Sequence, residues 1–208
     1  RPPNYDFFVE LADLLASIRE HPLDIDLTQM VSKMHETKTR GFYSRLQTSS
    51  RIVDYNMFGT ITGRLTTKKN SFPLLTLNKD YRSVVRPTNT WFIELDFNAA
   101  ELRCLLALNE QPQPEKDMHE WHGSIFNKLS DHTLARADIK RKIFGWLYGP
   151  LDASLGIPQI EKHYDKKKIL NKYWDGSKVT NPFGRTVPAD EFHALNAIIQ
   201  STTSDTFL

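Results

Sequence analysis

The chain has 208 residues, 39% of them hydrophobic and 25% charged, which is enough apolar material for one or two compact units with a real core. Its net charge of only +2 excludes a uniformly basic nucleic-acid binder, although residues 140–142 and 166–168 form basic runs that suit either phosphate contacts or solvated faces. A lone cysteine, Cys104, excludes an internal disulfide and favours an intracellular, non-secreted protein, and no apolar stretch approaches the roughly 18 residues of a membrane span.

The predicted elements follow from hydrophobic periodicity. Residues 7–18 have the spacing of an amphipathic helix, and residues 27–35 predict a second helix. Residues 51–61 and 91–97 are predicted to be strands, because they are rich in aromatic and β-branched side chains. Residues 117–175 are predicted to be mostly helical, with a break at Gly149-Pro150.

Asp96 lies where the second predicted strand meets a predicted helix. The strand is expected to be buried, and the leucines of the following helix are expected to face inward. A carboxylate at a strand's end can hold Mg²⁺, which prefers hard oxygen ligands and shares them with substrate phosphates. An Asp at such a junction can equally serve as a helix cap.

Residues 136–149 contain a helical stripe that changes character along its length. Arg136, Lys140, Phe144 and Tyr148 recur every four residues, so they lie on one surface of the expected helix. Lys and Arg suit phosphate oxygens, whereas a ring offers a nucleobase a stacking partner. The stripe is therefore expected to bind a nucleoside triphosphate lengthwise, and the alternative is an ordinary amphipathic helix with a solvated basic end and core aromatics.

The stripe, with the glycines that follow Phe144 and Tyr148, resembles the Arg-x-x-x-Lys-x-x-x-Phe-Gly-x-x-Tyr-Gly fingers helix of the family A, DNA polymerase I-like, DNA polymerases. The resemblance implies an α+β fold, part of a right-hand polymerase with a palm sheet and mostly helical fingers. The implied divisions are a thumb base and palm entry (1–45), a first palm part (46–101), fingers (102–185) and a second palm part that ends before motif C (186–208).

The segment from Asp96 resembles motif A of the same family, Asp-Tyr-Ser-Gln-Ile-Glu-Leu-Arg. Four positions are kept at the right intervals: Asp96, Glu101, Leu102 and Arg103. The resemblance makes Asp96 one of two catalytic metal-binding aspartates, gives the Phe97 carbonyl to the metal, and makes Glu101 the steric gate against a ribose 2′-hydroxyl. Residues 97–100 depart from the family pattern, and Ala99 lacks the polar contacts of the usual Gln.

Weaker matches follow the family's order. Thr62-Gly63-Arg64-Leu65-Thr66 resembles the family's Thr-Gly-Arg-Leu-Ser segment. Asp117-Met118-His119 resembles its Asp-x-His segment, whose His is near the triphosphate. Without the resemblance, His119 would be interpreted as a structural or solvated histidine. The loop at 180–185 and the helix at 196–205 resemble two further segments, with Thr186, Phe192 and Ser201 as departures. The implied DNA contacts are Arg64, Arg103, Gly149, Arg185, Asn196 and Gln200, of which the two amides would otherwise be surface residues of an amphipathic helix.

The resemblance implies template-directed DNA synthesis, in which a primer 3′-hydroxyl attacks a dNTP with the help of two Mg²⁺ ions. Asp96 and Lys140 are the expected catalytic residues. The residues expected to bind the dNTP are Glu101, His119, Arg136, Lys140, Phe144 and Tyr148. The expected partners are primer-template DNA, dNTPs and the remainder of the polypeptide, with no membrane. The divergent motif interiors favour a phage or viral replicase, in the cytoplasm or nucleoid of its host cell.

The family's motif C, His-Asp-Glu, supplies the second aspartate and does not occur in these residues. The neighbours Asp131 and His132 stand in the opposite order, in an expected polar turn, and cannot replace it. The expectation is therefore a fragment that is inactive by itself. Two alternatives stay open: a single-subunit RNA polymerase, against which Phe144-Gly145 and Glu101 argue, and a catalytically inactive polymerase-like module that binds nucleic acid.

Overall fold

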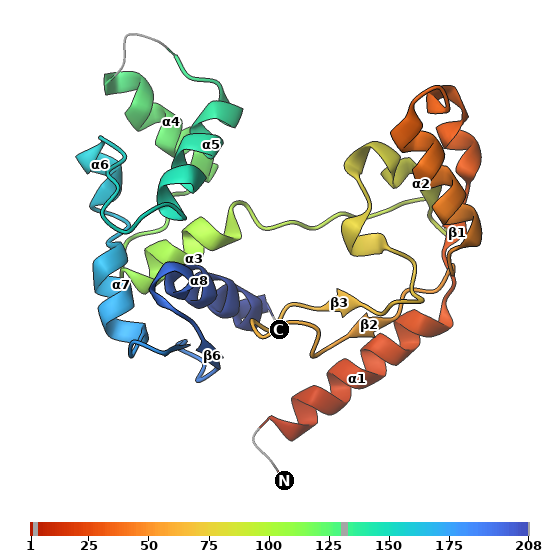
Figure 1. Cartoon of the computed structure of the whole chain (residues 1–208), viewed down its shortest axis with the longest axis horizontal. Coiled ribbons are helices and arrows are strands. Elements are labelled where there is room, and N and C mark those ends of the chain that lie inside the picture. The colour runs from red at the N-terminus through yellow and green to blue at the C-terminus, as the bar shows by residue number, and fades with distance from the viewer. Residues whose placement is uncertain (2–3, 130–132, 208) are drawn as a thin grey trace. The chain divides into compact units, whose positions relative to one another are not determined.

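The computed structural model describes residues 1, 4–129 and 133–207, and the chain forms two compact units. The first consists of residues Arg1–Thr60 and Arg64–Glu94, and the second of Ile61–Gly63 and Leu95–Leu208. In Figure 1 the first unit runs from red to yellow-green, and the main segment of the second unit runs from yellow-green to blue. Asp131 and His132, with the polar turn expected there, lie outside the described residues.

The first unit combines helical turns with two short ladders. Its helices are α1 (Tyr5–Glu20), η1 (Leu27–Lys33), α2 (Thr37–Thr48), η2 (Leu74–Thr76) and η3 (Lys79–Val84), the three η elements being 3-10 helices. β1 (Asp24–Ile25) pairs antiparallel with β4 (Val85–Arg86), and β2 (Tyr55–Asn56) with β3 (Thr66–Thr67). The core residues are Met30, Phe42, Leu46, Val53, Phe72, Leu77 and Val84.

The two helices predicted in this unit are present, and one takes a tighter form than expected. α1 contains the predicted residues 7–18, while the segment after Asp26 is a 3-10 helix. Asp26 begins that helix by accepting hydrogen bonds from the Thr28 amide and hydroxyl, 3.0 and 2.6 Å long, and it also pairs with Arg86. These contacts lower the pKa of the Asp26 carboxyl to about 2, the Thr28 side-chain bond being the main cause.

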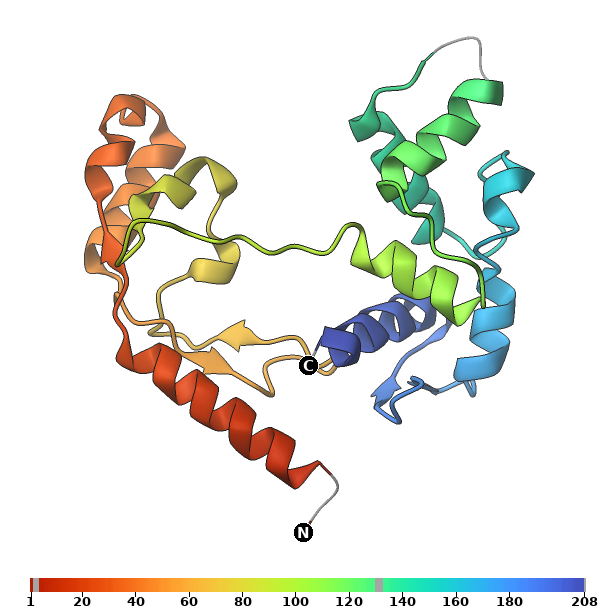
Figure 2. The ribbon, with the colours of Figure 1, turned by 180° about the vertical axis from the view of Figure 1, so that it is seen from behind.

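The second unit is mostly helical. It contains α3 (Ala100–Leu108), α4 (Met118–Leu129), α5 (Arg136–Leu147), α6 (Pro158–Glu161), α7 (Lys166–Tyr173) and α8 (Glu191–Phe207), together with the antiparallel hairpin of β5 (Lys178–Thr180) and β6 (Thr186–Pro188). Figures 1 and 2 both show α3 beside α8, and α4 also packs on α5. The helical prediction for residues 117–175, with its break after α5, is confirmed.

Both strand predictions need correction. Within 51–61 only Tyr55–Asn56 is a strand, and residues 91–97 form none. The latter run is also exposed rather than buried, with Trp91 at 78%, Ile93 at 85% and Leu95 at 90% of their full accessibility. A strand needs a neighbouring strand to bond its backbone N–H and C=O groups, and no described residue forms backbone ladder hydrogen bonds with residues 91–97. Asp96 therefore follows an extended segment, not a buried strand.

The resulting architecture is α+β, with small sheets and a large helical share. Each ladder has two strands, so the described residues contain no larger sheet of the kind a palm implies. The division into thumb, palm and fingers stays a prediction. In the part of the chain that the structure describes, no helix has both the length and the apolar character needed to cross a membrane.

Candidate functional site

The predicted stripe lies on one face of α5. Arg136 and Lys140 are exposed, and Phe144 and Tyr148 are half-buried. The two rings stack with centroids 5.9 Å apart and planes 20° apart, while the Lys140 Nζ lies 5.9 Å from the centre of the Phe144 ring. The face therefore runs from two cations to two stacked rings, which we call the α5 face.

The face of α5 that adjoins the stripe anchors the helix in the core of its unit. Ile139, Ile143, Trp146 and Leu147 are buried there. The hydrophobic free energy of these four side chains fixes the rotation of the helix, which leaves Arg136 and Lys140 exposed and Phe144 and Tyr148 half-buried at the edge of the core. The amphipathic interpretation of the helix is thus correct for these residues, but the aromatic rings of the stripe are only partly in the core.

Glu101 meets the aromatic end of the α5 face from another helix. It lies in the first turn of α3, and its Oε2 accepts a 2.5 Å hydrogen bond from the Tyr148 hydroxyl. A short bond between a hydroxyl and a carboxylate is among the stronger protein hydrogen bonds. The structure thereby joins two predicted dNTP-binding residues that are 47 positions apart in the sequence.

Asp117 organises the cationic end. Its carboxylate pairs with the Arg136 Nη2 at 2.7 Å, receives the Asn98 side-chain amide, and accepts the backbone N–H groups of His119 and Glu120 at 2.9 and 3.0 Å. These bonds hold the pKa of the Asp117 carboxyl well below its usual value, with the Arg136 bond as the largest cause. In the sequence, Asp117 is recognisable only as part of the Asp-x-His motif. Its spacing from Arg136 follows no local pattern, so the ion pair between the two residues could not be predicted.

His119 lies beside the α5 face but is nearly covered. Its ring is 6.1 Å from that of Phe144 and the residue is only 4% exposed. Burial, helped by the neighbouring charge of Arg136, lowers the pKa of His119, so the imidazole is neutral at pH 7. Its Nδ1 is buried without a hydrogen-bond partner among the described residues, so this polar atom is unsatisfied.

Sequence reasoning missed His122 and Asn98. His122 is fully buried, and its Nε2 lies 2.9 Å from the Tyr164 hydroxyl. Asn98 accepts the Met118 N–H at 2.9 Å, and Arg103 donates to the Asn98 carbonyl at 2.9 Å and also to the carbonyls of Pro114 and Lys116. Asn98 stands where the resemblance fails, and that departure was the one available signal. Arg103, a predicted DNA contact, holds this loop.

Asp96 and Phe97 form none of the contacts described above. Both are exposed, and the Phe97 ring stacks on Phe207 of α8 at 3.9 Å. Among the described residues, no group of three or more His, Cys, Asp or Glu side chains is gathered as a metal site would be. Asp96 and the Phe97 carbonyl therefore offer one carboxylate and one backbone oxygen.

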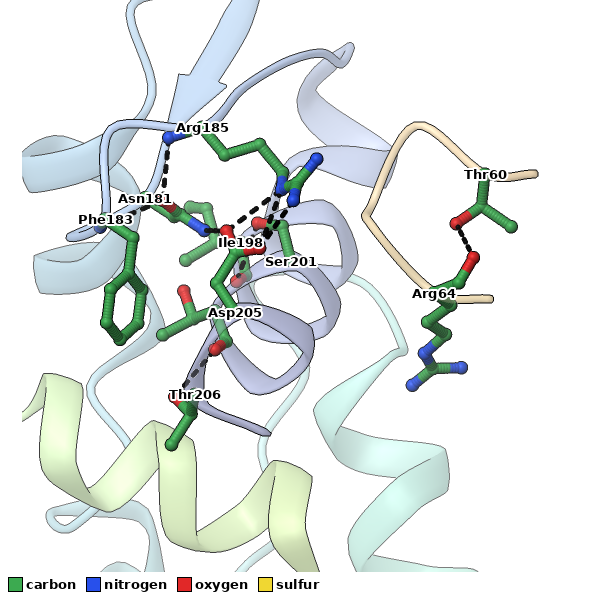
Figure 3. Close-up of polar contacts among 10 residues, drawn as sticks. Thr60, Arg64, Asn181, Phe183, Arg185, Ile198, Ser201, Asp205 and Thr206 are labelled. Carbon is green, nitrogen blue, oxygen red and sulfur yellow. Dashed lines mark hydrogen bonds and ion pairs between the residues drawn. The ribbon is translucent and has the colours of Figure 1, made fainter. Parts of the chain in front are cut away.

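Arg185, another predicted DNA contact, is engaged by α8. Figure 3 shows its guanidinium directed at Asp205, with Nη2 2.6 Å from one carboxylate oxygen and Nε at 2.9 and 3.0 Å from the two. Asn181 donates to the same carboxylate at 2.8 Å and accepts the Arg185 N–H. Gly63 lies against this pair with φ +86°, and a Cβ there would be 2.7 Å from the Arg185 Nη2. The positive φ favours glycine at this position, and a larger residue would also have to displace the Arg185 guanidinium.

The remaining predicted DNA contacts are distributed over both units. Asn196 accepts a 2.7 Å bond from Gln200 on α8, and it lines a cavity of about 590 Å³ with Tyr148 and Gly149. A Cβ at Gly149 would be 2.7 Å from the Gly145 carbonyl, so this turn needs a glycine. Arg64 belongs to the first unit, where its carbonyl accepts the Thr60 hydroxyl at 3.0 Å (Figure 3).

In fold, the chain is similar to a solved structure described as the POL domain of Pol1 from M. smegmatis in complex with DNA primer-template and dNTP. The TM-score is 0.54 and the sequence identity 16%. The match covers 88% of this chain and 44% of that chain, so this chain matches less than half of the length of the solved domain. No protein family model matches the sequence, and no curated protein matches it.

Proposed function

We propose that the second unit carries the nucleotide-binding face and one catalytic carboxylate of a family A DNA polymerase. The reaction is template-directed transfer of a nucleotide from a dNTP to a primer 3′-hydroxyl, with pyrophosphate as the leaving group. The fold likeness to a polymerase domain supports the class of protein. The arrangement of the α5 face supports the substrate.

The observation that carries the proposal is the order of chemistry along α5. From Arg136 to Tyr148 the helix rises about 18 Å at 1.5 Å per residue, which matches a nucleotide laid from triphosphate to base. Arg136 and Lys140 bind the phosphate oxygens through charge-assisted hydrogen bonds. Phe144 and Tyr148 border the sugar and base, with their rings already stacked before a ligand arrives.

Two further residues complete the pocket. Glu101, held by the Tyr148 hydroxyl, borders the sugar and opposes a ribose 2′-hydroxyl by its bulk and position. His119, neutral and nearly buried beside Phe144, offers one imidazole nitrogen to the phosphates. Asp117 shares Arg136 with the substrate, because its carboxylate bonds the guanidinium through one nitrogen only, Nη2.

Asp96 and the Phe97 carbonyl would hold Mg²⁺. Their oxygens fit that ion, which commonly takes one or two protein carboxylates and completes its shell with water and substrate phosphates. Bound there, Mg²⁺ supplies charge neutralisation on the phosphates and activation of the primer hydroxyl. The protein's own share is to hold the dNTP and the primer end in line, which is the main catalytic contribution in phosphoryl transfer.

Primer extension by the natural polypeptide tests the proposal, with Asp96→Asn as the variant. Removing one preorganised charge should reduce the rate by at least about 10²- to 10³-fold while primer-template binding persists. Asp152→Asn, an exposed carboxylate on the same unit, is the matched control and should extend normally. Near-normal extension by Asp96→Asn would remove Asp96 from the mechanism. Preference for rNTPs would indicate an RNA polymerase, and DNA binding without extension an inactive module.

A further inference from the structure

Lys166 differs from its two neighbours in the basic run. It is 6% exposed, whereas Lys167 and Lys168 are exposed on the outer side of α7. The sequence indicates only that the three lysines are a solvated face or a phosphate patch. For Lys166 the structure supports neither, because the side chain is almost fully buried and borders the cavity of Tyr148 and Asn196, not the outer surface.

The Lys166 ammonium points at the end of α5. Nζ donates to the carbonyl of Trp146 at 3.1 Å and to that of Pro150 at 3.3 Å, and it lies 4.9 Å from the centre of the Trp146 ring. No carboxylate forms an ion pair with it among the described residues, although Glu161 and Asp152 are near enough to favour its charge. Two backbone oxygens and one aromatic face therefore replace the water that burial removed.

These contacts cap a helix from outside it. The last carbonyls of any helix lack intrahelical donors and carry the negative end of the helix dipole, so a cation there is favourable. The Trp146 carbonyl also receives the Gly149 N–H at 3.3 Å. Lys166 thus binds the last turn of α5 and the turn after it at the same point.

Tyr148 lies between the two carbonyls that Lys166 holds. It is the residue at which α5 ends, with its N–H bonded to the Phe144 carbonyl at 3.0 Å. Its ring stacks on Phe144 and its hydroxyl bonds Glu101. A shift of the turn would move the Tyr148 ring and hydroxyl together, because both are carried by that backbone.

We propose that Lys166 is a positioning residue for the nucleotide pocket, which fixes Tyr148 by tying residues 146 and 150 together and touches no substrate itself. The pocket's occupant rests on the function proposed above, but the effect of Lys166 on the turn does not.

The first experiment is amide hydrogen exchange on the 208-residue chain, which needs no activity. Lys166→Met keeps the length of the side chain but removes its donors, and it should speed exchange at Tyr148 and Gly149 by at least about tenfold. Lys168→Met, three residues from the α7 N-cap Asp165 and exposed, should leave both amides unchanged. Unchanged protection in Lys166→Met, or equal acceleration throughout α3 to α8, would overturn the proposal. If Lys166→Met does not fold, Lys166→Gln takes its place with the same expectation.

The second experiment is steady-state extension by the natural polypeptide. Lys166→Met should raise the KM for dNTP by about tenfold and change kcat by less than about threefold, and Lys166→Arg should restore most of the affinity. In a Tyr148→Phe background the effect of Lys166→Met on KM should shrink, because both changes act on one contact. Strictly additive effects would contradict a role through Tyr148. No extension by the unaltered polypeptide would defeat the proposed function and leave the exchange result to decide the role of Lys166.

Discussion

At the residue scale, single contacts decide what the α5 face can recognise. The sequence places Phe144 and Tyr148 on one stripe through helical periodicity alone. That periodicity says nothing about Glu101, because the helix that carries it meets α5 only in the folded unit. The 2.5 Å bond between Tyr148 and Glu101 supplies that missing relation.

The sugar preference is predicted to depend on Glu101. Glu101→Ala should raise the use of rNTPs relative to dNTPs by about tenfold or more, because a 2′-hydroxyl then meets no carboxylate. Glu101→Gln keeps the bulk and should change the ratio less. The measurement is kcat/KM for one dNTP and its matching rNTP, and equal ratios in Glu101→Ala and the unaltered polypeptide would exclude Glu101 from the proposed sugar site.

The buried imidazole of His122 predicts a loss of stability in acid. Burial, followed by the charges of His119 and His163 and opposed by Asp117, lowers the pKa of His122 from 6.5 to about 4. The folded protein therefore binds fewer protons than the unfolded chain between those pH values. Stability is retained above pH 6.5 and falls as the pH drops toward 4, by up to about 3 kcal/mol from this group.

Urea unfolding at pH 7.5 and at pH 4.5 measures this effect. His122→Gln can still bond the Tyr164 hydroxyl but cannot titrate, so the difference between the two pH values should shrink. His21→Gln, at an exposed histidine, is the control and should keep the full difference. An unchanged pH dependence in His122→Gln would assign the loss to other groups, of which His119 and His163 are the first candidates.

At the element scale, helices with one apolar face could be predicted from the sequence, whereas the strands could not. α1 and α5 show their period of 3.6 in the sequence, and burial of one face follows from it. Residues 91–97 have strand composition, but a strand also needs a paired neighbour, which composition cannot supply. The burial of Lys166 could not be predicted from the sequence either, because the neighbouring Lys167 and Lys168 have the same side chain but are exposed.

The contact between the β5–β6 hairpin and α8 is predicted to depend on Asp205. Asp205→Asn removes the charge that holds Arg185 and should lower the free energy of unfolding by about 1–3 kcal/mol. Asp152→Asn breaks an exposed pair with Lys167 and should cost less than about 0.5 kcal/mol. Denaturant unfolding of both variants decides the point, and equal values would mean that the Arg185 pair contributes no more than a surface pair.

At the scale of the whole molecule, short motifs predicted which residues share a helical face but not how the helices pack. The spacing within residues 136–149 placed four residues on one face, and the structure confirms that face. The pairing of Arg136 with Asp117 and the near-complete burial of His119 depend on how α4 packs on α5, which no local pattern encodes. The roles of Asp96 and of the DNA contacts stay predictions, because their partners are a metal and a nucleic acid.

Binding of a dNTP to the 208-residue chain tests the central claim most directly, with Lys140→Ala compared against Lys142→Ala on the same helix. Both lysines are exposed, but only Lys140 lies on the α5 face. Loss of a charge-assisted phosphate contact should raise the Kd in Lys140→Ala by at least about tenfold, while Lys142→Ala should change it by less than about twofold. Equal effects of the two substitutions, or no binding by the unaltered chain, would contradict a nucleotide site on α5.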